Sequence, residues 1–461
     1  MSIVNPSVNR GSRGLLLKIL IISLLSGLIL IALAMISSTI SDRQEYRDAA
    51  VKSISDSYAS SQRLVGPVLV QPYTRTQIVQ ITGKPAETSV EYEVYSIFPT
   101  ELQVHGEIVS SERHHGLYKV PVYEFRGKVE GTFIVPADVV TGDVKFEHPY
   151  LALGVSDVRG LVGTPVFSVN GVPLQLAQDN VSDAPASVKL PLRAALSGVE
   201  GGKPTKLSFS LDLALAGTEH LSIAPVANSN HIELHSIWPS PLFEGNFLPR
   251  SRDVSSGGFT ASWDISSLAS ATQRQMSDKL NGDMDTLVVS LLEPVDAYKL
   301  SSRAVKYGVL FVLLTFAGFF MYEIMNSLPI HPVQYLLIGF GLAIFFLLLI
   351  SFSEHIAFGI AYLLSSIACI GLLGFYLSFV LRNVGRGMVF SILLTLLYSC
   401  LYGLLLSEDN ALLLGSLLLF AILAGIMYVT RNVDWYRRGT ELEQAKSAQD
   451  TDWSTPPPPA P

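Results

Sequence analysis

The carboxyl-terminal part of this chain has almost no charged residues. This feature limits the possible folds of the chain more than any other. From Ala304 to Thr430 there are 3 basic and 4 acidic residues in 127 positions. From Ile40 to Arg303 there are 22 Lys or Arg and 30 Asp or Glu residues in 264 positions. Long uncharged apolar runs are typical of membrane-spanning helices and rare in soluble proteins. The sequence therefore excludes a freely soluble protein and predicts a membrane protein that carries a polar domain.

Six apolar stretches are long enough to cross a bilayer as helices. A spanning helix needs about 20 mainly apolar residues, because the hydrocarbon core is about 30 Å thick and a helix rises about 1.5 Å per residue. The last five stretches are joined by short connectors, so we expect them to pack as a bundle. The predicted spans cover approximately residues 15–36, 307–325, 333–352, 356–381, 388–406 and 411–429.

The positions of Lys and Arg predict the orientation of these spans, since short cytoplasmic loops carry an excess of both. Two connectors contain Glu354-His355 and Glu408-Asp409 and no basic residue, which places them on the opposite side. Arg303 and Lys306 are the one mild conflict. We expect cytoplasmic termini, and we expect the polar domain on the far side of the membrane. The basic residues that mark the cytoplasmic segments are Arg10, Arg13, Arg382, Arg386, Arg431, Arg437 and Arg438.

The first span has a second interpretation as a cleaved signal peptide. Ala32-Leu33-Ala34 resembles a cleavage site, and basic residues precede the apolar run. The run continues through Ile36, however, and is longer than the roughly 7 to 15 apolar residues of a signal peptide. A retained anchor is therefore favoured, while cleavage after Ala34 stays open. Both alternatives export the polar domain.

The polar domain begins with a helical pattern and then changes to the pattern of strands. Tyr46, Ala50, Ile54 and Tyr58 are four residues apart, which predicts a helix that continues beyond the first span and packs this stripe onto the domain. The rest is rich in Gly and Pro and lacks a βαβ pattern, so we expect an antiparallel, β-rich domain, either a sandwich or two linked sheets.

Three segments carry the strand prediction. Residues 207–216 alternate Leu or Phe with mainly small or polar residues, and residues 90–97 alternate in the same way, as expected of strands with one buried face. Asn170-Gly171 lies between two apolar runs and predicts a tight hairpin turn, since both residues tolerate positive φ.

Several residues are candidates for chemistry, and each also has a structural interpretation. Glu354 and His355 could contribute to a metal site or a proton relay, but metal sites need three or four ligands. His114-His115 is a second candidate metal or pH-sensing pair. Glu323 lies near the end of a span, where a charge usually reaches the headgroups. We favour the structural interpretation in each case.

Other polar and aromatic features also favour structural roles. Cys369 and Cys400 lie within predicted spans and are interpreted as small packing residues. Residues 237–243 combine aromatic residues with prolines and are predicted to form a rigid crossing that buries the aromatics, with an exposed recognition loop as the alternative. The small polar residues of the spans are expected to support helix packing; these are Ser365, Ser366, Thr395, Ser399 and Ser416.

The sequence supplies no catalytic, cofactor-binding or metal-binding residue set. Nucleophile elbows, zinc-protease motifs and phosphate-binding loops are absent in any supporting context. The net charge is −7 and no basic run occurs, which argues against nucleic acid as a partner. We therefore expect no enzyme activity and no cofactor. The expected partners are the lipid bilayer and an unknown ligand or protein of the cell envelope.

Several segments, in order along the chain, resemble the CreD family of inner-membrane proteins, also described as cell-envelope integrity proteins. The likeness covers about residues 40–436. It does not extend to the amino-terminal residues before Leu15 or to the Pro-rich end. The segments that carry it are Arg63–Pro67, Gly154–Gly160, Trp238-Pro239, Gly245–Pro249, Asp296–Tyr298, Lys306-Tyr307, His331–Leu337, Ser353–His355, Ala411–Gly415 and Thr430–Tyr436.

The resemblance implies an α+β protein of the bacterial inner membrane with a periplasmic domain. It also implies a link to envelope integrity and to the response to β-lactam stress, with no catalytic residues to transfer. The expected organisation is a cytoplasmic tail (residues 1–14), a transmembrane helix (15–36), a β-rich periplasmic domain (37–303), a five-helix transmembrane bundle (304–430) and a cytoplasmic tail (431–461) that is disordered and Pro-rich at its end.

Three functional hypotheses follow from these observations. The first is a non-enzymatic envelope protein whose periplasmic domain binds or senses a ligand. The second is a transporter or flippase of a lipid-linked or amphipathic envelope substrate, whose apolar pathway would need no buried charge. The third is an intramembrane enzyme that uses Glu354 and His355.

Overall fold

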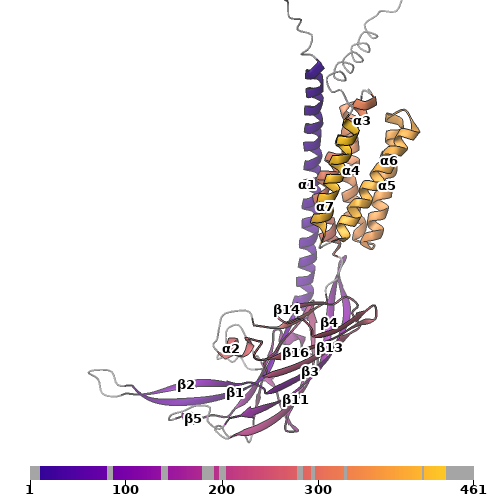
Figure 1. The fold of residues 1–461 in the computed structure, drawn as a ribbon. Coiled ribbons are helices and arrows are strands. Elements are labelled where there is room, and N and C mark those ends of the chain that lie inside the picture. The colour runs from indigo at the N-terminus through magenta and orange to yellow at the C-terminus, as the bar shows by residue number, and fades with distance from the viewer. Residues whose placement is uncertain are drawn as a thin grey trace, which may run out of the picture. The chain divides into compact units, whose positions relative to one another are not determined.

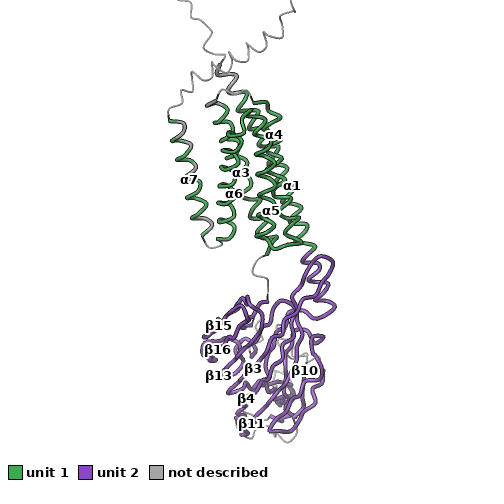
Figure 2. Tube along the Cα trace, turned by 90° about the vertical axis from the view of Figure 1, so that its right-hand side faces the viewer, with its two compact units in different colours: residues 1–46, 295–461 green, residues 47–294 purple. Residues whose placement is uncertain are grey.

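A computed structural model shows that the chain forms two compact units (Figure 2). It describes residues 11–79, 87–136, 144–178, 192–196, 204–277, 284–291, 296–326, 330–407 and 410–431. The first unit, the helical unit, contains residues 1–46 and 295–461, and the second, the β unit, contains residues 47–294. The predicted α+β membrane architecture is thereby confirmed. The predicted disordered tail and the pair Glu408-Asp409 lie outside the described residues.

The first helix, α1 (Gly11–Ser57), is a single helix of 47 residues that contributes to both units (Figure 1). Its apolar half has the length and composition of a membrane span. Ile29, Leu33 and Ile40 are at most 2% exposed in the core of the helical unit. The predicted continuation of the first span as a helix is confirmed.

Five more long helices complete the described part of the helical unit. Together with α1, the first four of them are long and apolar enough to cross a membrane. The fifth, α7, contains a shorter apolar segment, Leu413–Gly425, so a sixth span stays a prediction. These helices are α3 (Ala297–Asn326), α4 (Pro332–Ser353), α5 (Phe358–Val380), α6 (Val384–Leu406) and α7 (Ala411–Thr430).

Local sequence explains where two of these helices begin. His331 caps α4 by accepting a hydrogen bond from the amide of Val333, and Pro332 occupies the first turn, where its missing N–H is not needed. The side chain of Asn383 caps α6 by accepting from Gly385 N at 2.8 Å. Such caps satisfy amides that have no partner within the helix.

Glycines rather than the small hydroxyl residues bring these helices close together. A Cβ at Gly339 would lie 2.6 Å from Ile29, and one at Gly341 would lie 2.8 Å from Leu373. The hydroxyls of Thr395, Ser399 and Ser416 instead bond to carbonyls of their own helices, because a hydroxyl can reach the preceding turn. All three residues are exposed, so the predicted packing role is wrong for them, whereas Ser365 and Ser366 are buried as that role requires.

The β unit contains a nine-stranded and an eight-stranded sheet, which confirms the prediction of two sheets (Figure 1). Most pairs are antiparallel, but β1 pairs with β12, and β13 with β3, in parallel. The first sheet runs β14 (Leu242–Gly245), β17 (Leu287–Ser290), β12 (His220–Ala224), β1 (Gln62–Val79), β6 (Tyr150–Val155), β10 (Leu192–Ala195) and β9 (Ala177–Gln178), with β2 (Glu87–Ile97) and β5 (Val144–Phe146) also on β1. The second runs β15 (Ser251–Ser255), β16 (Gly258–Ser266), β13 (Ser229–Ser236), β3 (Glu101–His115), β4 (Tyr118–Val135), β11 (Thr205–Thr218), β7 (Val166–Val169) and β8 (Val172–Leu174).

Two of the three strand predictions are confirmed in full. Residues 207–216 lie in β11, whose apolar residues are buried at every second position. Asn170 and Gly171 have φ of 48° and 78° and join β7 to β8. Residues 90–97 form part of β2 as predicted, but Val90 and Tyr92 are more than half exposed. The single buried face is wrong there, because this part of β2 pairs with β1 away from the core.

Residues 237–243 form a crossing that buries part of its aromatic surface. Phe243 packs edge-on against Phe259 and Trp263, with ring centroids 5.6 and 5.7 Å apart. Trp238 is half-buried and donates its indole N–H to Ser240 O, while Ile237 stays exposed. The structural interpretation therefore holds for the aromatic residues.

Candidate functional site

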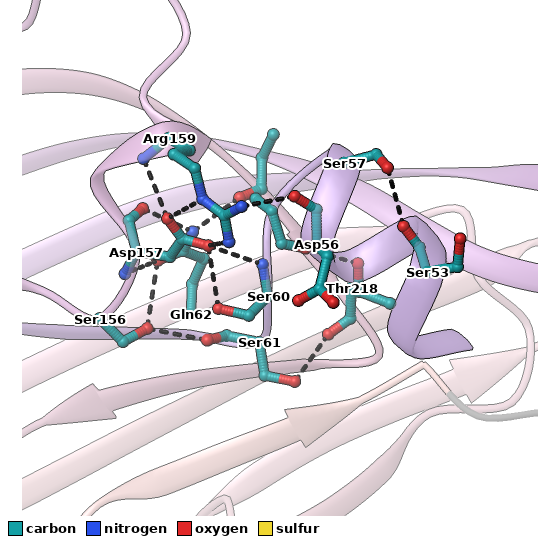
Figure 3. A network of polar contacts seen from close by, with 12 residues as sticks. Ser53, Asp56, Ser57, Ser60, Ser61, Gln62, Ser156, Asp157, Arg159 and Thr218 are labelled. Atoms are coloured by element: carbon teal, nitrogen blue, oxygen red, sulfur yellow. Dashed lines mark hydrogen bonds and ion pairs between the residues drawn. The ribbon is translucent and has the colours of Figure 1, made fainter. Parts of the chain in front are cut away.

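The end of α1 is joined to the β unit by a dense polar network (Figure 3). Its centre is Asp157, which begins the short 3-10 helix η2 (Val158–Gly160). Residues around position 60, where α1 has ended and β1 begins, meet this loop although about a hundred residues separate the two in sequence. We call this set the helix clasp; its members are Asp56, Ser60, Ser61, Gln62, Ser156, Asp157, Arg159 and Thr218.

The Asp157 carboxylate is 9% exposed and accepts hydrogen bonds from five donor atoms. Oδ1 accepts from Arg159 N at 3.1 Å and from Arg159 Nε at 2.9 Å, and Oδ2 accepts from Arg159 Nη2 at 2.6 Å. The amide and hydroxyl of Ser60 donate to Oδ2, each at 3.1 Å. The hydrogen bonds from the Arg159 side chain, and to a lesser extent those from Ser60, hold the pKa of Asp157 well below its usual range. The carboxylate is therefore charged throughout the physiological pH range.

Arg159 also caps the carboxyl end of α1. Its Nη1 donates to the carbonyl of Asp56 in the last turn of the helix. The last carbonyls of a helix have no partner within the helix, and a cation there interacts favourably with the helix dipole. One guanidinium thus binds both the Asp157 carboxylate and the end of α1.

Gln62 satisfies the buried backbone on the other side of the clasp. Its side chain is 1% exposed. Nε2 donates to the carbonyls of Asp157 and Ala216, both at 3.0 Å, and Oε1 accepts from Asp157 N at 3.3 Å. Thr218 adds a bond from its hydroxyl to Ala59 O at 2.6 Å. Because buried polar groups are costly when unpaired, this arrangement fixes where β1 begins.

Two neighbours leave little space for any other arrangement. A Cβ at Gly160 would lie 2.3 Å from both Ala216 O and Gln62 Nε2, so only glycine fits. The Tyr123 hydroxyl donates to His220 O at 2.7 Å beside Gln62. Burial raises the pKa of Tyr123 far above its usual value, so this hydroxyl stays protonated and remains a donor.

An apolar contact lies beside the clasp. Ile54 of α1 packs with Val120 and Val122 of β4, and Tyr58 adds to this cluster. The predicted packing of the helical stripe is confirmed for this end. Tyr46, however, is 63% exposed, so the prediction is wrong at the first position of the stripe.

Glu323 is buried within the helical unit instead of pointing outward, which corrects the prediction for this residue. Its side chain is 1% exposed within the helical unit and forms an ion pair with Lys18 of α1. It also accepts hydrogen bonds from Ile330 N at 2.9 Å and from the Tyr335 hydroxyl at 2.8 Å. Three donors from different segments make burial tolerable, since an unpaired charge in an apolar interior is expensive.

The other predicted candidates are not brought together. Glu354 ends α4 and lies 3.5 Å from Arg43 Nε of α1, whereas His355 is exposed. His114 and His115 are exposed at the end of β3. Cys369 is buried, and its thiol contacts the Tyr398 hydroxyl and Gly341 O. Among the residues that the structure describes, no group of three or more His, Cys, Asp and Glu side chains could hold a metal ion.

Sequence reasoning did not single out Asp157 and Arg159 as a functional pair. The signal was nevertheless in the sequence, because Arg63–Pro67 and Gly154–Gly160 both belong to the segments that carry the family resemblance. These two segments lie side by side, with Leu64 opposite Val155 and Val65 opposite Gly154. Their proximity in space could not be deduced from their separation along the chain.

Comparisons with known proteins match nearly the whole chain to a protein family. Residues 14–436 match the model of a family described as "Inner membrane protein CreD". The chain is 34% identical to the inner membrane protein CreD of Escherichia coli (strain K12), over 92% of this chain and 94% of that protein.

Similarity to solved structures is weak. A Legionella pneumophila protein named provisionally for nutrient binding matches with a TM-score of 0.26 and 11% identity, over 46% of this chain and 82% of that one. An M1 zinc metallopeptidase from Deinococcus radiodurans matches with a TM-score of 0.22 and 10% identity, over 42% of each chain.

Proposed function

The chain belongs to the CreD family of inner membrane proteins, and on that premise we propose a non-enzymatic role in cell-envelope integrity and in the response to β-lactam stress. In this proposal the β unit is periplasmic and binds or senses a component of the envelope, and α1 transmits its state to the membrane helices. The proposed topology has six spans, cytoplasmic termini and a retained first span.

The helix clasp is the observation that carries this proposal. A domain that only needs an anchor can be attached through a flexible linker. Here α1 runs as one helix from a candidate membrane span into the β unit. Its last turn is held there by Arg159, and the following residues are held by Asp157. A rearrangement of the loop around Asp157 would therefore act directly on α1.

Retention of the first span is supported by contacts within the helical unit. Cleavage after Ala34 would remove Lys18 from Glu323 and leave a buried carboxylate without its cation. It would also remove Ile29 and Leu33 from the core. Alkaline phosphatase fused near residue 200 should be active, whereas a fusion after residue 440 should be inactive. The reverse pattern would overturn the topology.

The functional test compares a deletion strain with strains that carry single variants. Deletion should increase sensitivity to β-lactams and other envelope stresses, and wild-type protein and the exposed-carboxylate control Asp253→Ala should restore resistance. Asp157→Ala should fail to restore it at equal abundance in the membrane, measured by immunoblot. A deletion strain with wild-type behaviour under every envelope stress contradicts the proposed function. Full restoration by Asp157→Ala contradicts transmission through the clasp.

A further inference from the structure

A depression of about 630 Å³ lies on the exposed face of the eight-stranded sheet. The depression is shallow and open to solvent, so a ligand in it would keep part of its surface exposed. Its floor comes from the central strands β3, β4 and β11, and one wall comes from the segment that joins η2 to β7. The charged and apolar residues that define it are His105, Glu107, Arg126, Lys128, Asp212, Val162 and Val166.

Strand register alternates positive and negative charge across this floor. Arg126 and Lys128 are two residues apart on β4, so their side chains point to the same face. Glu107 of β3 lies opposite Arg126, and Asp212 of β11 lies opposite Lys128. The floor therefore offers two cations at its centre and a carboxylate on either side.

Both cations keep donors that a ligand can use. Arg126 binds Glu124 through Nε at 2.8 Å, and within the described residues its two terminal nitrogens have no hydrogen-bond partner. Lys128 Nζ lies 2.7 Å from Glu130 and is a threefold donor. Arg126 donates to Glu124 and Lys128 donates to Glu130, and these hydrogen bonds raise the pKa of Arg126 and Lys128, so both remain cationic.

The wall of the depression is apolar. Val162 and Val166 are 44% and 60% exposed. Val162 N donates to Ala214 O at 2.9 Å, and Leu161 bridges to Leu215, so this wall is fixed to the edge of the floor at β11. Aliphatic surface beside paired charges suits a ligand that carries both charged and aliphatic groups.

We propose that this depression binds a short amphoteric peptide with aliphatic side chains. Its carboxylate is held by Arg126 and Lys128, its ammonium group by Glu107 or Asp212, and its side chains by Val162 and Val166. Arg126 can bind a carboxylate through two parallel N–H groups, which gives directional recognition. This inference rests on the proposed function and names the ligand class that the β unit would sense.

The same wall connects the ligand site to the helix clasp. Val162 follows Arg159 by three residues, and Gly160, in between, packs so closely on Gln62 and Ala216 that an added Cβ would lie 2.3 Å from both. A peptide that displaces Val162 would therefore act on the loop that holds the end of α1. The ligand site and the clasp lie in the same β unit.

In the direct test, the full-length protein in lipid nanodiscs is titrated with tri-alanine, and binding is measured by isothermal titration calorimetry. Saturable binding is expected, and the double variant Arg126→Gln with Lys128→Gln should weaken it about tenfold or more, because two charge-assisted contacts are lost. Lys119→Gln, an exposed cation on the same strand, is the matched control and should bind normally. Equal affinity of the double variant and wild type would overturn the proposal, provided that both unfold at the same temperature.

Two further probes test the ligand class. Tri-alanine that is acetylated and amidated at its ends carries no charge and should not bind. Glycerophosphoethanolamine carries a phosphate and an amine without a peptide. Binding of this compound with no binding of tri-alanine would overturn the peptide assignment, as would equal binding of the blocked peptide.

Failure of this inference can be distinguished from failure of the proposed function. If tri-alanine does not bind while the wild-type gene still restores envelope resistance, the ligand assignment is wrong and the envelope role stands. If tri-alanine binds and deletion has no envelope phenotype, the envelope role is wrong and the binding site stands. In the strain assay, the Arg126 and Lys128 double variant is expected to lose the response to envelope stress.

Discussion

The two units each bury a carboxylate, and they stabilise it in different ways. Glu323 in the helical unit obtains its cation, Lys18, from another helix. Asp157 in the β unit is paired with Arg159, which lies only two positions later in the same loop. Lipid cannot replace a missing partner, whereas water can reach a surface loop. The ion pair in the helical unit therefore joins two helices, α1 and α3, whereas the ion pair in the β unit fixes the conformation of one loop.

The largest effect is expected from loss of the cation in the helical unit. Lys18→Met leaves Glu323 buried without its cation, which should lower the free energy of unfolding by about 3–5 kcal/mol. Lys18→Met combined with Glu323→Gln should recover most of this loss, since an apolar or neutral replacement of a buried pair is often nearly neutral. The measurement is denaturant unfolding of purified protein in detergent micelles.

The exposed Lys306→Met is the control for this comparison. If Lys18→Met were no more destabilising than the control, pairing with Glu323 would have no role in assembly.

The next effect tests the steric constraint in the β unit. Gly160→Ala places a Cβ 2.3 Å from Ala216 O and from Gln62 Nε2, so the clasp must open or shift. Overpacking of this kind costs about 1–3 kcal/mol. Gly257→Ala is the matched control, because its nearest neighbour would be 3.7 Å away. Equal unfolding temperatures of the two variants would contradict a tight fit at Gly160.

Replacement of the Asp157 carboxylate tests the charged hydrogen bonds of the clasp. Asp157→Asn should lower the free energy of unfolding by about 1.5–3 kcal/mol at neutral pH, the usual range for bonds to a charged group. The pKa of Asp157 is lower in the folded than in the unfolded protein. Its contribution is therefore complete above the unfolded pKa of about 3.9, and it is lost as pH falls through the folded pKa.

Unfolding curves recorded from neutral pH into acid test this sign. The difference in stability between wild type and Asp157→Asn should shrink below about pH 4. A difference that is independent of pH, or that grows in acid, would show that the charge of Asp157 does not stabilise the clasp.

The smallest effect is expected from Tyr123→Phe. It removes the hydrogen bond to His220 O and the long one, 3.4 Å, from Gln62 N, and should cost about 1 kcal/mol. The aromatic ring stays in the core, so the β unit should keep its fold. Thermal unfolding followed by near-ultraviolet circular dichroism measures this change. A loss of about 3 kcal/mol or more, well beyond one or two neutral hydrogen bonds, would mean that Tyr123 has a wider structural role.

Sequence periodicity predicted the long helices and a few strand segments of the β unit, because it reports directly on which face of a helix or strand is buried. Residues 207–216 and the turn at Asn170 depend only on neighbours in sequence, and both predictions are confirmed. The burial of Glu323 was missed because its partner, Lys18, is 305 positions away. The clasp was missed for the same reason, since Gln62 and Asp157 meet only after two strands have paired.

The uninterrupted length of α1 also has a consequence for its angular phase. An α-helix turns through about 100° for each residue, because it has about 3.6 residues per turn. One alanine inserted after Ile40, between the buried apolar part of α1 and the clasp, would change the azimuth of everything beyond it by that angle. Seven inserted alanines, close to two full turns, would nearly restore the original phase. If resistance to envelope stress is lost with one inserted alanine and regained with seven, the rotational phase of α1 is required for its function.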